Sequence, residues 1–305
     1  MIPVVATIEE IRQSVRNARS NGRTVGLVPT MGALHEGHVR LIRACREAAD
    51  FVVVSIFVNP TQFGPHEDYS RYPRTLDDDL RRCSEGGTSV IFAPTVEAMY
   101  PTGSLSTYVE VPGLSDILEG ASRPGHFRGV ATVVLKLLNI VGPDLAYFGE
   151  KDFQQLLVIR RMAADLDLPV VIRGVPTVRE ADGLAMSSRN RYLGPEERKA
   201  AAVLSGALRE AVAAVSAGER STGRVRQILR SRIESEYRAR IDYAEVADAT
   251  TLQPLDEVGG NRRAVALLAV RVGPARLIDN ALLPEVSDAD QVAEKQTPPG
   301  GRHGE

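Results

Sequence analysis

The sequence predicts an α/β protein, with a Rossmann-like doubly wound parallel sheet followed by a smaller C-terminal α+β domain. Apolar runs such as 25–28 and 51–58 alternate with amphipathic stretches, a pattern typical of parallel strands joined by crossover helices. After about residue 184 the sequence becomes rich in alanine and then in strand-like segments. We therefore expect a nucleotide- and substrate-binding domain over 1–183, an α+β domain over 184–284, and a disordered polar tail over 285–305.

The first domain is expected to open with a helix over 7–21, because Thr7 and Glu10 fit a capping box. A buried strand over 25–28 follows, and Pro29 and Gly32 are expected to break it. Apolar periodicity predicts the later elements, which are helices over about 38–49, 76–86, 130–141 and 153–166 and strands over 51–58, 89–92, 144–148 and 170–175. The intervening 100–129 segment is rich in Gly, Pro and Ser and is expected to be a functional loop.

The second domain is predicted from helix formers and apolar runs. Strong helix formers over 195–217 and an amphipathic pattern over 221–237 indicate two helices. Strands are expected over 241–246 and 264–270, with a short one near 276–278. Together these elements indicate a compact α+β unit.

Composition excludes several classes of protein. The 305 residues have a formal charge of −2, so no basic surplus favours nucleic acid binding. No apolar run approaches the roughly 20 residues that span a bilayer, and charged residues interrupt the N-terminus where a signal peptide would need an apolar core. Cys45 and Cys83 lack metal-ligand spacing and are expected to stay reduced, which suits a cytoplasmic protein.

Two histidines, His35 and His38, lie where the first buried strand ends and a helix begins. That corner is where open α/β sheets bind ligands, and helix N-termini attract phosphate. A zinc pair would need a third ligand, and none with clear spacing lies nearby. A plain surface pair is the simpler alternative. The hypothesis with more chemical content is that both imidazoles donate to a triphosphate during nucleotidyl transfer.

Polar residues also follow other predicted strands. Asn59–Phe63 follows the 51–58 strand, where Asn59 could simply cap a turn or its carboxamide could bind substrate. Lys151 lies among carboxylates after the 144–148 strand, either on the surface or neutralising phosphate. Residues 186–190 could form a capped turn or close over phosphates. Asp77–Asp79 could be a solvated helix start or could hold Mg²⁺.

The His-x-Gly-His spacing resembles the signature of the nucleotidyltransferase superfamily. Over roughly residues 20–280 the sequence is similar to the pantothenate synthetase (pantoate–β-alanine ligase) family. Met186–Arg189 also resembles the mobile Lys-Met-Ser-Lys-Ser element of class I aminoacyl-tRNA synthetases. The segments that carry the family resemblance occur in the family's order, and they are 29–38, 55–63, 72–75, 123–129, 148–155 and 186–190.

The resemblance implies an AMP-forming ligase of pantothenate biosynthesis. Such an enzyme condenses (R)-pantoate with β-alanine through a pantoyl-adenylate, consuming ATP and releasing AMP and diphosphate. A lid that excludes water from the adenylate is expected. The resemblance also implies a homodimer and a requirement for Mg²⁺ as the counterion of ATP, with no nucleic acid or membrane partner.

Carried over position by position, the resemblance implies a set of site residues. His38 is the expected proton donor, assisted by His35 and Lys151. The expected ATP-binding residues are Met31, Gly32, Ala33, Leu34, His35, Glu36, Gly37, His38, Gly149, Glu150, Lys151, Asp152, Val178, Met186, Ser187, Ser188 and Arg189. Gln62, Gln155 and Asn59 are expected to bind pantoate and β-alanine. Asp78 and Asp79 match positions proposed to bind Mg²⁺, which ATP alone could also hold.

Two alternatives remain open from sequence. The first is another nucleotidyltransferase or carboxylate-adenylating ligase with the same histidine corner, including a ligase that acts on tRNA. The modest length and the lack of a basic surplus stand against the tRNA ligase. The second is a non-catalytic regulator that binds a nucleotide without releasing AMP.

Overall fold

The structure is a computed structural model that describes residues 2–65, 67–103 and 106–285. The chain divides into two compact units, Met1–Leu193 and Gly194–Glu305. This division falls at Leu193 rather than at residue 183, because the segment before it is bound to the first unit. Arg189 forms an ion pair with Asp68 there. Of the predicted tail, all but Glu285 lies outside the described residues.

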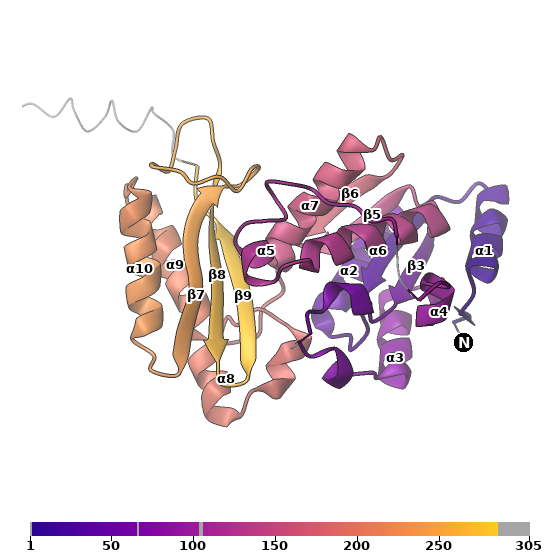
Figure 1. The fold of residues 1–305 in the computed structure, drawn as a ribbon, viewed down its shortest axis with the longest axis horizontal. Helices are drawn as coiled ribbons and strands as arrows, with labels where there is room; N and C mark the ends of the chain where they lie inside the picture. Colours follow the sequence, from indigo (N-terminus) through magenta and orange to yellow (C-terminus); the bar gives the residue numbers. More distant parts are fainter. Residues whose placement is uncertain (1, 66, 104–105, 286–305) are drawn as a thin grey trace, which may run out of the picture. The chain divides into compact units, whose positions relative to one another are not determined.

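The first unit is built on a parallel sheet with the strand order β1-β4-β3-β2-β5-β6 (Figure 1). The order reverses beside β2, which confirms the predicted doubly wound, Rossmann-like sheet. The sequence did not predict β1, because two residues carry no periodic signal. The strands are β1 (Val4–Val5), β2 (Val25–Thr30), β3 (Phe51–Ile56), β4 (Val90–Phe92), β5 (Leu145–Gly149) and β6 (Val171–Val175).

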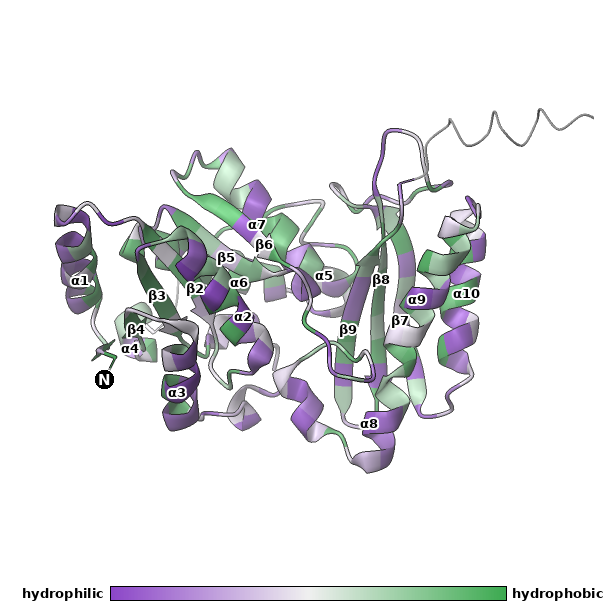
Figure 2. Cartoon of the chain, turned by 180° about the vertical axis from the view of Figure 1, so that it is seen from behind, coloured by the Kyte–Doolittle hydropathy of each residue, from purple (hydrophilic) through white to green (hydrophobic). Residues whose placement is uncertain are grey.

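Helices cover both faces of this sheet (Figures 1 and 2). On one face α2 packs against α3 and against β2, β3, β5 and β6, whereas α6 packs with α1 and α7 on the other. The predicted capping box of Thr7 and Glu10 is present at the start of α1. The helices are α1 (Ile8–Ser20), α2 (Glu36–Ala48), α3 (Leu76–Gly86), α4 (Val96–Met99), α5 (Glu119–Ser122), α6 (His126–Val141) and α7 (Phe153–Asp165).

Apolar strands form the core between these two helical layers. Val28, Val54 and Ile91 from β2, β3 and β4 have no more than 1% exposed surface. They pack with Ile42 of α2, and Figure 2 shows the strands as mostly hydrophobic. This burial explains the near-continuous apolar runs in the sequence, because a parallel strand covered on both faces has no polar side.

Pro29 continues β2 instead of ending it, which differs from the expectation. The carbonyl of Val25 accepts from the N–H of Asp144, so the odd-numbered residues of β2 face β5. Pro29 faces the same way but has no N–H to donate. The pairing of β2 with β5 stops at Leu27, while its pairing with β3 continues to Thr30. Pro29 therefore lies where β2 and β5 are no longer paired, at the point where the strand order reverses.

The second unit has an antiparallel sheet in the order β7-β8-β9, confirming the predicted α+β character. The predicted 195–217 helix is two helices, because the N–H of Ala202 bonds to the carbonyl of Lys199 in a tight turn. The third strand is also longer than expected. The elements are α8 (Pro195–Ala201), α9 (Val203–Ser216), α10 (Thr222–Glu234), β7 (Ala239–Asp248), β8 (Ala264–Val272) and β9 (Ala275–Leu282).

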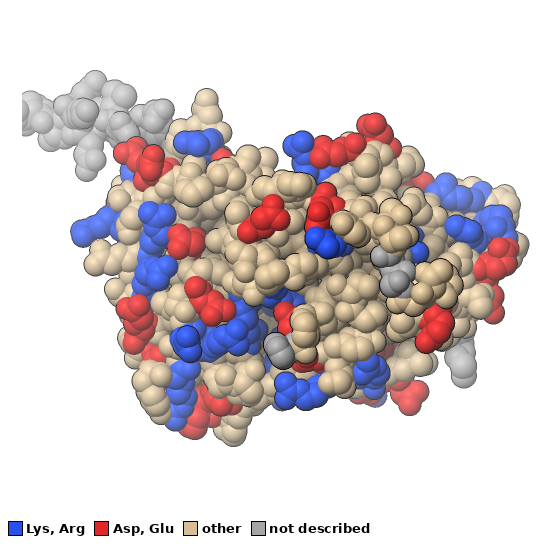
Figure 3. Space-filling model, in the orientation of Figure 1, with Lys and Arg blue, Asp and Glu red and all other residues tan. Residues whose placement is uncertain are grey.

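Charged side chains of both signs are interspersed over the molecular face seen in Figure 3. Ion pairs in the second unit join Arg226 and Arg230 to Glu245, and Arg276 to Asp242. Within the part of the chain that the structure describes, none of the helices has the length and hydrophobicity to cross a membrane.

Candidate active site

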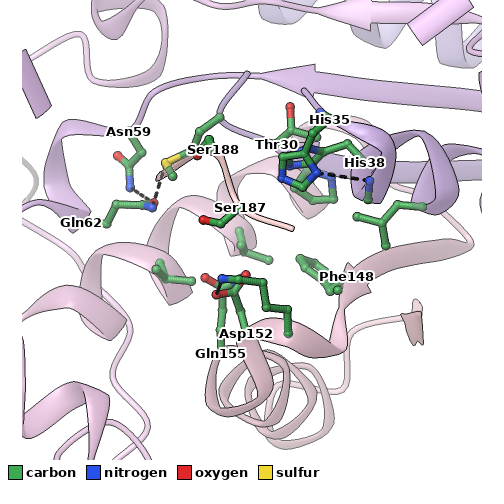
Figure 4. A pocket seen from close by; sticks show the side chains of 18 of the residues that line it. Thr30, His35, His38, Asn59, Gln62, Phe148, Asp152, Gln155, Ser187 and Ser188 are labelled. Carbon is green, nitrogen blue, oxygen red and sulfur yellow. Dashed lines mark hydrogen bonds and ion pairs between the residues drawn. The ribbon is translucent and has the colours of Figure 1, made fainter. Parts of the chain in front are cut away.

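One pocket collects most of the sequence-predicted site residues, and its lining belongs entirely to the first unit. Its walls come from the carboxyl ends of β2, β3, β5 and β6, beside Pro29, where β2 and β5 are no longer paired. Figure 4 shows His35 and His38 on one side, Asn59 and Gln62 on a second, and residues following β5 opposite the histidines. The expected convergence at the sheet's carboxyl edge is therefore present in the structure.

Each of the two histidine rings accepts a hydrogen bond from a backbone N–H at the start of α2. His35 is the N-cap residue and His38 occupies the third helical position. The N–H of His35 donates to Nδ1 of His38, and the N–H of Gly37 donates to Nδ1 of His35, both over 3.2 Å. The ring centroids lie 4.1 Å apart. Polar groups that a helix start leaves unpaired thus fix both rings.

These contacts determine which ring nitrogens carry protons. Because Nδ1 of each ring accepts a hydrogen bond, the neutral imidazoles carry hydrogen on Nε2. Burial, followed by the charge of Lys151, lowers the pKa of His35 to about 4. Burial and the neighbouring His35 hold the pKa of His38 well below its usual value. At neutral pH the pair therefore offers two Nε2–H donors without carrying a net positive charge.

A second group of side chains fixes the amide of Gln62. Asn59 is 1% exposed, and its Nδ2 donates to Oε1 of Gln62 over 3.0 Å. The hydroxyl of Tyr100 donates to Oδ1 of Asn59 over 2.7 Å, which fixes the orientation of that amide. Nε2 of Gln62 lies 3.0 Å from the sulfur of Met31, so the donor end of Gln62 is directed toward the strand end of β2.

Arg123 and His126 hold the backbone of Gln62, a role the sequence did not assign to them. Nδ1 of His126 lies 2.9 Å from the Gln62 carbonyl, which can only accept, so Nδ1 carries the hydrogen. Nε2 then accepts from Arg123 over 3.1 Å. Both carboxylate oxygens of Glu67 accept from the same guanidinium, at 2.7 and 2.6 Å. In the sequence, residues 123–129 stood out only as one of the segments that carry the family resemblance, and their spacing did not show that Arg123 and His126 contact Gln62.

The opposite wall carries Lys151, Asp152 and Gln155. Lys151 follows β5 and lies 3.5 Å from Asp152. After burial, its positive charge is the second cause of the lowered pKa of His35. Gln155 lines the pocket, while the neighbouring Gln154 is buried and donates to backbone carbonyls instead.

Residues 186–189 complete the lining, together with Val178. The hydroxyl of Ser188 lies 3.2 Å from that of Tyr72. The guanidinium of Arg189 forms a two-point ion pair with Asp68, with distances of 3.2 and 3.0 Å. Arg189 therefore already has a carboxylate partner, and a phosphate would have to compete with Asp68 for it.

Several sequence-predicted residues lie outside the pocket lining. Gly32, Ala33 and Leu34 are buried behind it. Glu36 is exposed and pairs with Arg43. The remaining three are Glu150, Asp78 and Asp79. Among the described residues, no group of three or more His, Cys, Asp or Glu side chains could hold a metal ion. One face of α6 adds an apolar wall that the sequence did not predict, formed by Val130, Val133, Val134 and Leu137.

Buried histidines make the stability of the first unit dependent on pH. Burial, then the charge of Arg123, lowers the pKa of His126 to about 4, against 6.5 for the exposed residue. Between these pH values the unfolded chain binds the proton and the folded chain does not, so stability falls as the pH falls. We expect the free energy of unfolding to decrease from pH 6.5 to 5 by about 1 kcal/mol per pH unit from His126 alone.

Urea unfolding at several pH values measures this slope, and His126→Asn is the matched control. Asparagine keeps a donor toward the Gln62 carbonyl but does not titrate. The variant is expected to show a smaller slope between pH 6.5 and 5. An unchanged slope would assign the pH dependence to other groups.

Comparison with known proteins identifies the family. Residues 3–282 match the family Pantoate-beta-alanine ligase. Pantothenate synthetase of Pelotomaculum thermopropionicum is 58% identical over 92% of this chain and 98% of its own. The solved pantothenate synthetase of Thermus thermophilus is 47% identical, with a TM-score of 0.87 over 93% of this chain and 100% of its own.

A further solved relative was crystallised with ligands. This pantoate-β-alanine ligase from Francisella tularensis, complexed with β-γ ATP and β-alanine, is 36% identical. Its TM-score is 0.76, and the match covers 92% of this chain and 98% of the relative. The family match and these relatives extend over both units. The chain therefore belongs to the pantoate–β-alanine ligase family.

Proposed function

We propose that the chain condenses (R)-pantoate with β-alanine at the expense of ATP, through a pantoyl-adenylate. The carboxylate of pantoate would attack the α-phosphorus, expelling diphosphate, and the amine of β-alanine would then displace AMP. A free carboxylate is a poor acyl donor, and adenylation makes it a good one. The observation that carries the proposal is one pocket in which two Nε2–H donors lie across from amide groups suited to a hydroxy acid.

The histidine pair would act on the charge that develops at the α-phosphate. Preorganised donors in a site shielded from water stabilise such charge without reorganisation during the reaction. In our proposal the Nε2–H groups of His35 and His38 bind phosphate oxygens. The lowered pKa values favour donation of a hydrogen bond by a neutral imidazole over proton transfer from an imidazolium. This refines the sequence-based expectation that His38 donates a proton.

The side-chain amides of Asn59 and Gln62, which we call the amide wall, would bind the acid. Asn59 occupies one acceptor site of Gln62, so the NH₂ group of Gln62 is the group presented to pantoate. The same group would later meet the carboxylate of β-alanine. Gln155, on the opposite wall, would bind the hydroxyl of pantoate. The apolar face of α6 suits the methyl groups of pantoate, because it offers no competing polar atoms.

The remaining lining residues would hold the nucleotide. Lys151 would neutralise phosphate as a point charge. Val178 and Gly149 would contact adenosine, and the 186–189 segment would cover the phosphates. Mg²⁺ would enter with ATP as its counterion. ATP bound by a Francisella relative that is 36% identical over nearly the whole chain supports this assignment. We also propose a homodimer located in the cytoplasm.

Two measurements test the proposed reaction. Mass spectrometry after mixing the protein with ATP, Mg²⁺, pantoate and β-alanine should detect pantothenate and AMP in equal amounts. Exchange of labelled diphosphate into ATP should require pantoate and proceed without β-alanine. Exchange that requires an amino acid instead would favour a different adenylating ligase. ATP binding without AMP release would favour a nucleotide-binding regulator.

A further inference from the structure

The turn that leads into the histidine pair has an unusual backbone. Gly32 has a φ of +79° and Ala33 a φ of +50°. The left-handed region costs little for glycine but is unfavourable for alanine, whose Cβ approaches the following carbonyl. Two consecutive left-handed residues turn the chain from the end of β2 to His35, so the direction of both imidazoles depends on this turn.

The carboxylate of Asp79 holds that turn from α3. Its Oδ2 accepts from the N–H of Ala33 over 3.1 Å, and its Oδ1 accepts from the N–H of Leu34 over 2.7 Å. The hydroxyl of Thr75 adds a third donor at 3.3 Å. Asp79 is 1% exposed, and a Cβ on Gly32 would lie 3.0 Å from Oδ2. Both oxygens are thus used by the protein itself.

We propose that Asp79 is a positioning residue that stabilises the left-handed turn and thereby aims His35 and His38, and that it is not a ligand of Mg²⁺. Its neighbour Asp78 points elsewhere, because it is mostly exposed and pairs with Arg81 over 2.7 Å. The two carboxylates that sequence marks as a metal site therefore do not converge on a common point. Backbone N–H groups stand where a metal-binding carboxylate would face a cation.

The inference rests on the proposed function, because it concerns how the adenylating groups are held. Asp79→Asn tests it with little change in shape. The amide keeps one acceptor oxygen but turns an NH₂ group toward the second backbone N–H, so one donor loses its partner. We expect kcat for pantoate-dependent diphosphate exchange to fall at least tenfold. The KM for pantoate should stay within twofold, because Asn59, which lies outside this turn, orients the amide of Gln62.

The concentration of Mg²⁺ that gives half-maximal rate separates the two roles. A positioning residue predicts the same Mg²⁺ dependence in Asp79→Asn as in the unaltered protein, within twofold. A metal ligand predicts a shift to higher Mg²⁺ and recovery of rate there, which would overturn the inference. Asp78→Asn is the matched control, since it removes an adjacent carboxylate of the same helix, and it should leave both kcat and the Mg²⁺ dependence unchanged.

A second variant tests whether backbone strain is the cause. Glycine at position 33 adopts the left-handed region without penalty. The kcat of Asp79→Asn/Ala33→Gly should therefore be at least threefold higher than that of Asp79→Asn. No recovery would show that Asp79 does not act by supporting this turn. If Asp79→Asn alone fails to fold, the Mg²⁺ dependence of the rate is measured on the double variant instead.

Hydrogen–deuterium exchange of the 30–36 segment gives a readout that needs no activity. The amides of Ala33 and Leu34 should exchange faster in Asp79→Asn and not in Asp78→Asn. Unchanged exchange together with unchanged kcat would overturn the inference while leaving the proposed function intact. Failure of the proposed function would instead appear as the absence of pantoate-dependent exchange of diphosphate in the unaltered protein.

Discussion

Replacing His38 by alanine is expected to reduce pantoate-dependent diphosphate exchange by about 100-fold to 1,000-fold, the usual effect of removing one preorganised donor from a developing oxyanion. The structure supplies the reason for so large an effect. Nδ1 of His38 is already bound to the backbone of His35, so the ring has a fixed orientation and a single remaining donor. Alanine removes that donor and leaves only weakly positioned water to replace it.

The alanine variant also removes a helix cap, so a second variant separates the two effects. The N–H of His35 would lose its side-chain acceptor, at a cost of about 1 kcal/mol of stability. His38→Gln keeps that bond, because glutamine is a usual third residue of a capping box. We expect His38→Gln to unfold at the same urea concentration as the unaltered protein. Its exchange rate should lie within about tenfold of the alanine variant.

The pH profile of exchange gives a further check on the role of the pair. Both histidines have lowered pKa values, so activity should not fall along a limb centred near 6.5 as the pH rises. Bound triphosphate would raise these pKa values by Coulombic attraction, and this opposes the lowering that burial causes. An activity that requires imidazolium, with loss of rate above pH 6.5, would contradict the assignment of neutral donors.

Local patterns predicted the elements that carry the site. Apolar periodicity predicted the helix over 76–86, which the structure confirms, and a strand over 51–58, of which Phe51–Ile56 is strand. The strand-to-helix corner at His35 was predicted for the same reason. Parallel strands place their carboxyl ends along one edge, so the meeting of that corner with Gln62 and Lys151 also follows from topology.

Contacts between distant residues could not be predicted in this way. Arg123 and His126 reach the carbonyl of Gln62 across some sixty residues of chain, and no local periodicity encodes that distance. Asp79 likewise looks like one of three solvated carboxylates until the turn that it binds is known. Pro29 was expected to end β2, because its effect depends on which neighbouring strand it faces. In each case the outcome depends on tertiary hydrogen bonding.

The second large effect is expected at Gly129, where α6 packs directly against the backbone of Thr61 and Gln62. A Cβ there would lie 2.3 Å from the carbonyl oxygen of Thr61 and 2.7 Å from Cα of Gln62. Both are backbone atoms, so the clash cannot be relieved by rotating a side chain. The carbonyl of Gly129 also accepts from Asn59, the residue that orients the Gln62 amide. Alanine must therefore displace the turn that presents Gln62.

We expect Gly129→Ala to destabilise the first unit by about 1–3 kcal/mol, as overpacking of a tight contact usually does. It should raise the KM for pantoate more than the KM for ATP, because the turn carries Gln62 and lies apart from the residues proposed to bind the nucleotide. Urea unfolding and steady-state kinetics with each substrate varied measure both effects. Equal changes in the two KM values would show that the damage is general and not directed at Gln62.

Gly206 in α9 provides the matched glycine-to-alanine control. The nearest atom to an added Cβ is Nε of Arg232 at 3.4 Å, an ordinary contact with a flexible side chain. Alanine is the better helix former, so Gly206→Ala should stabilise the second unit by up to about 1 kcal/mol and leave both KM values unchanged. The two substitutions are chemically identical and both lie in helices. If their effects on stability have opposite signs, the difference must therefore come from the atoms that surround each glycine. Around Gly129 those atoms belong to the backbone that carries Gln62, the amide proposed to bind pantoate.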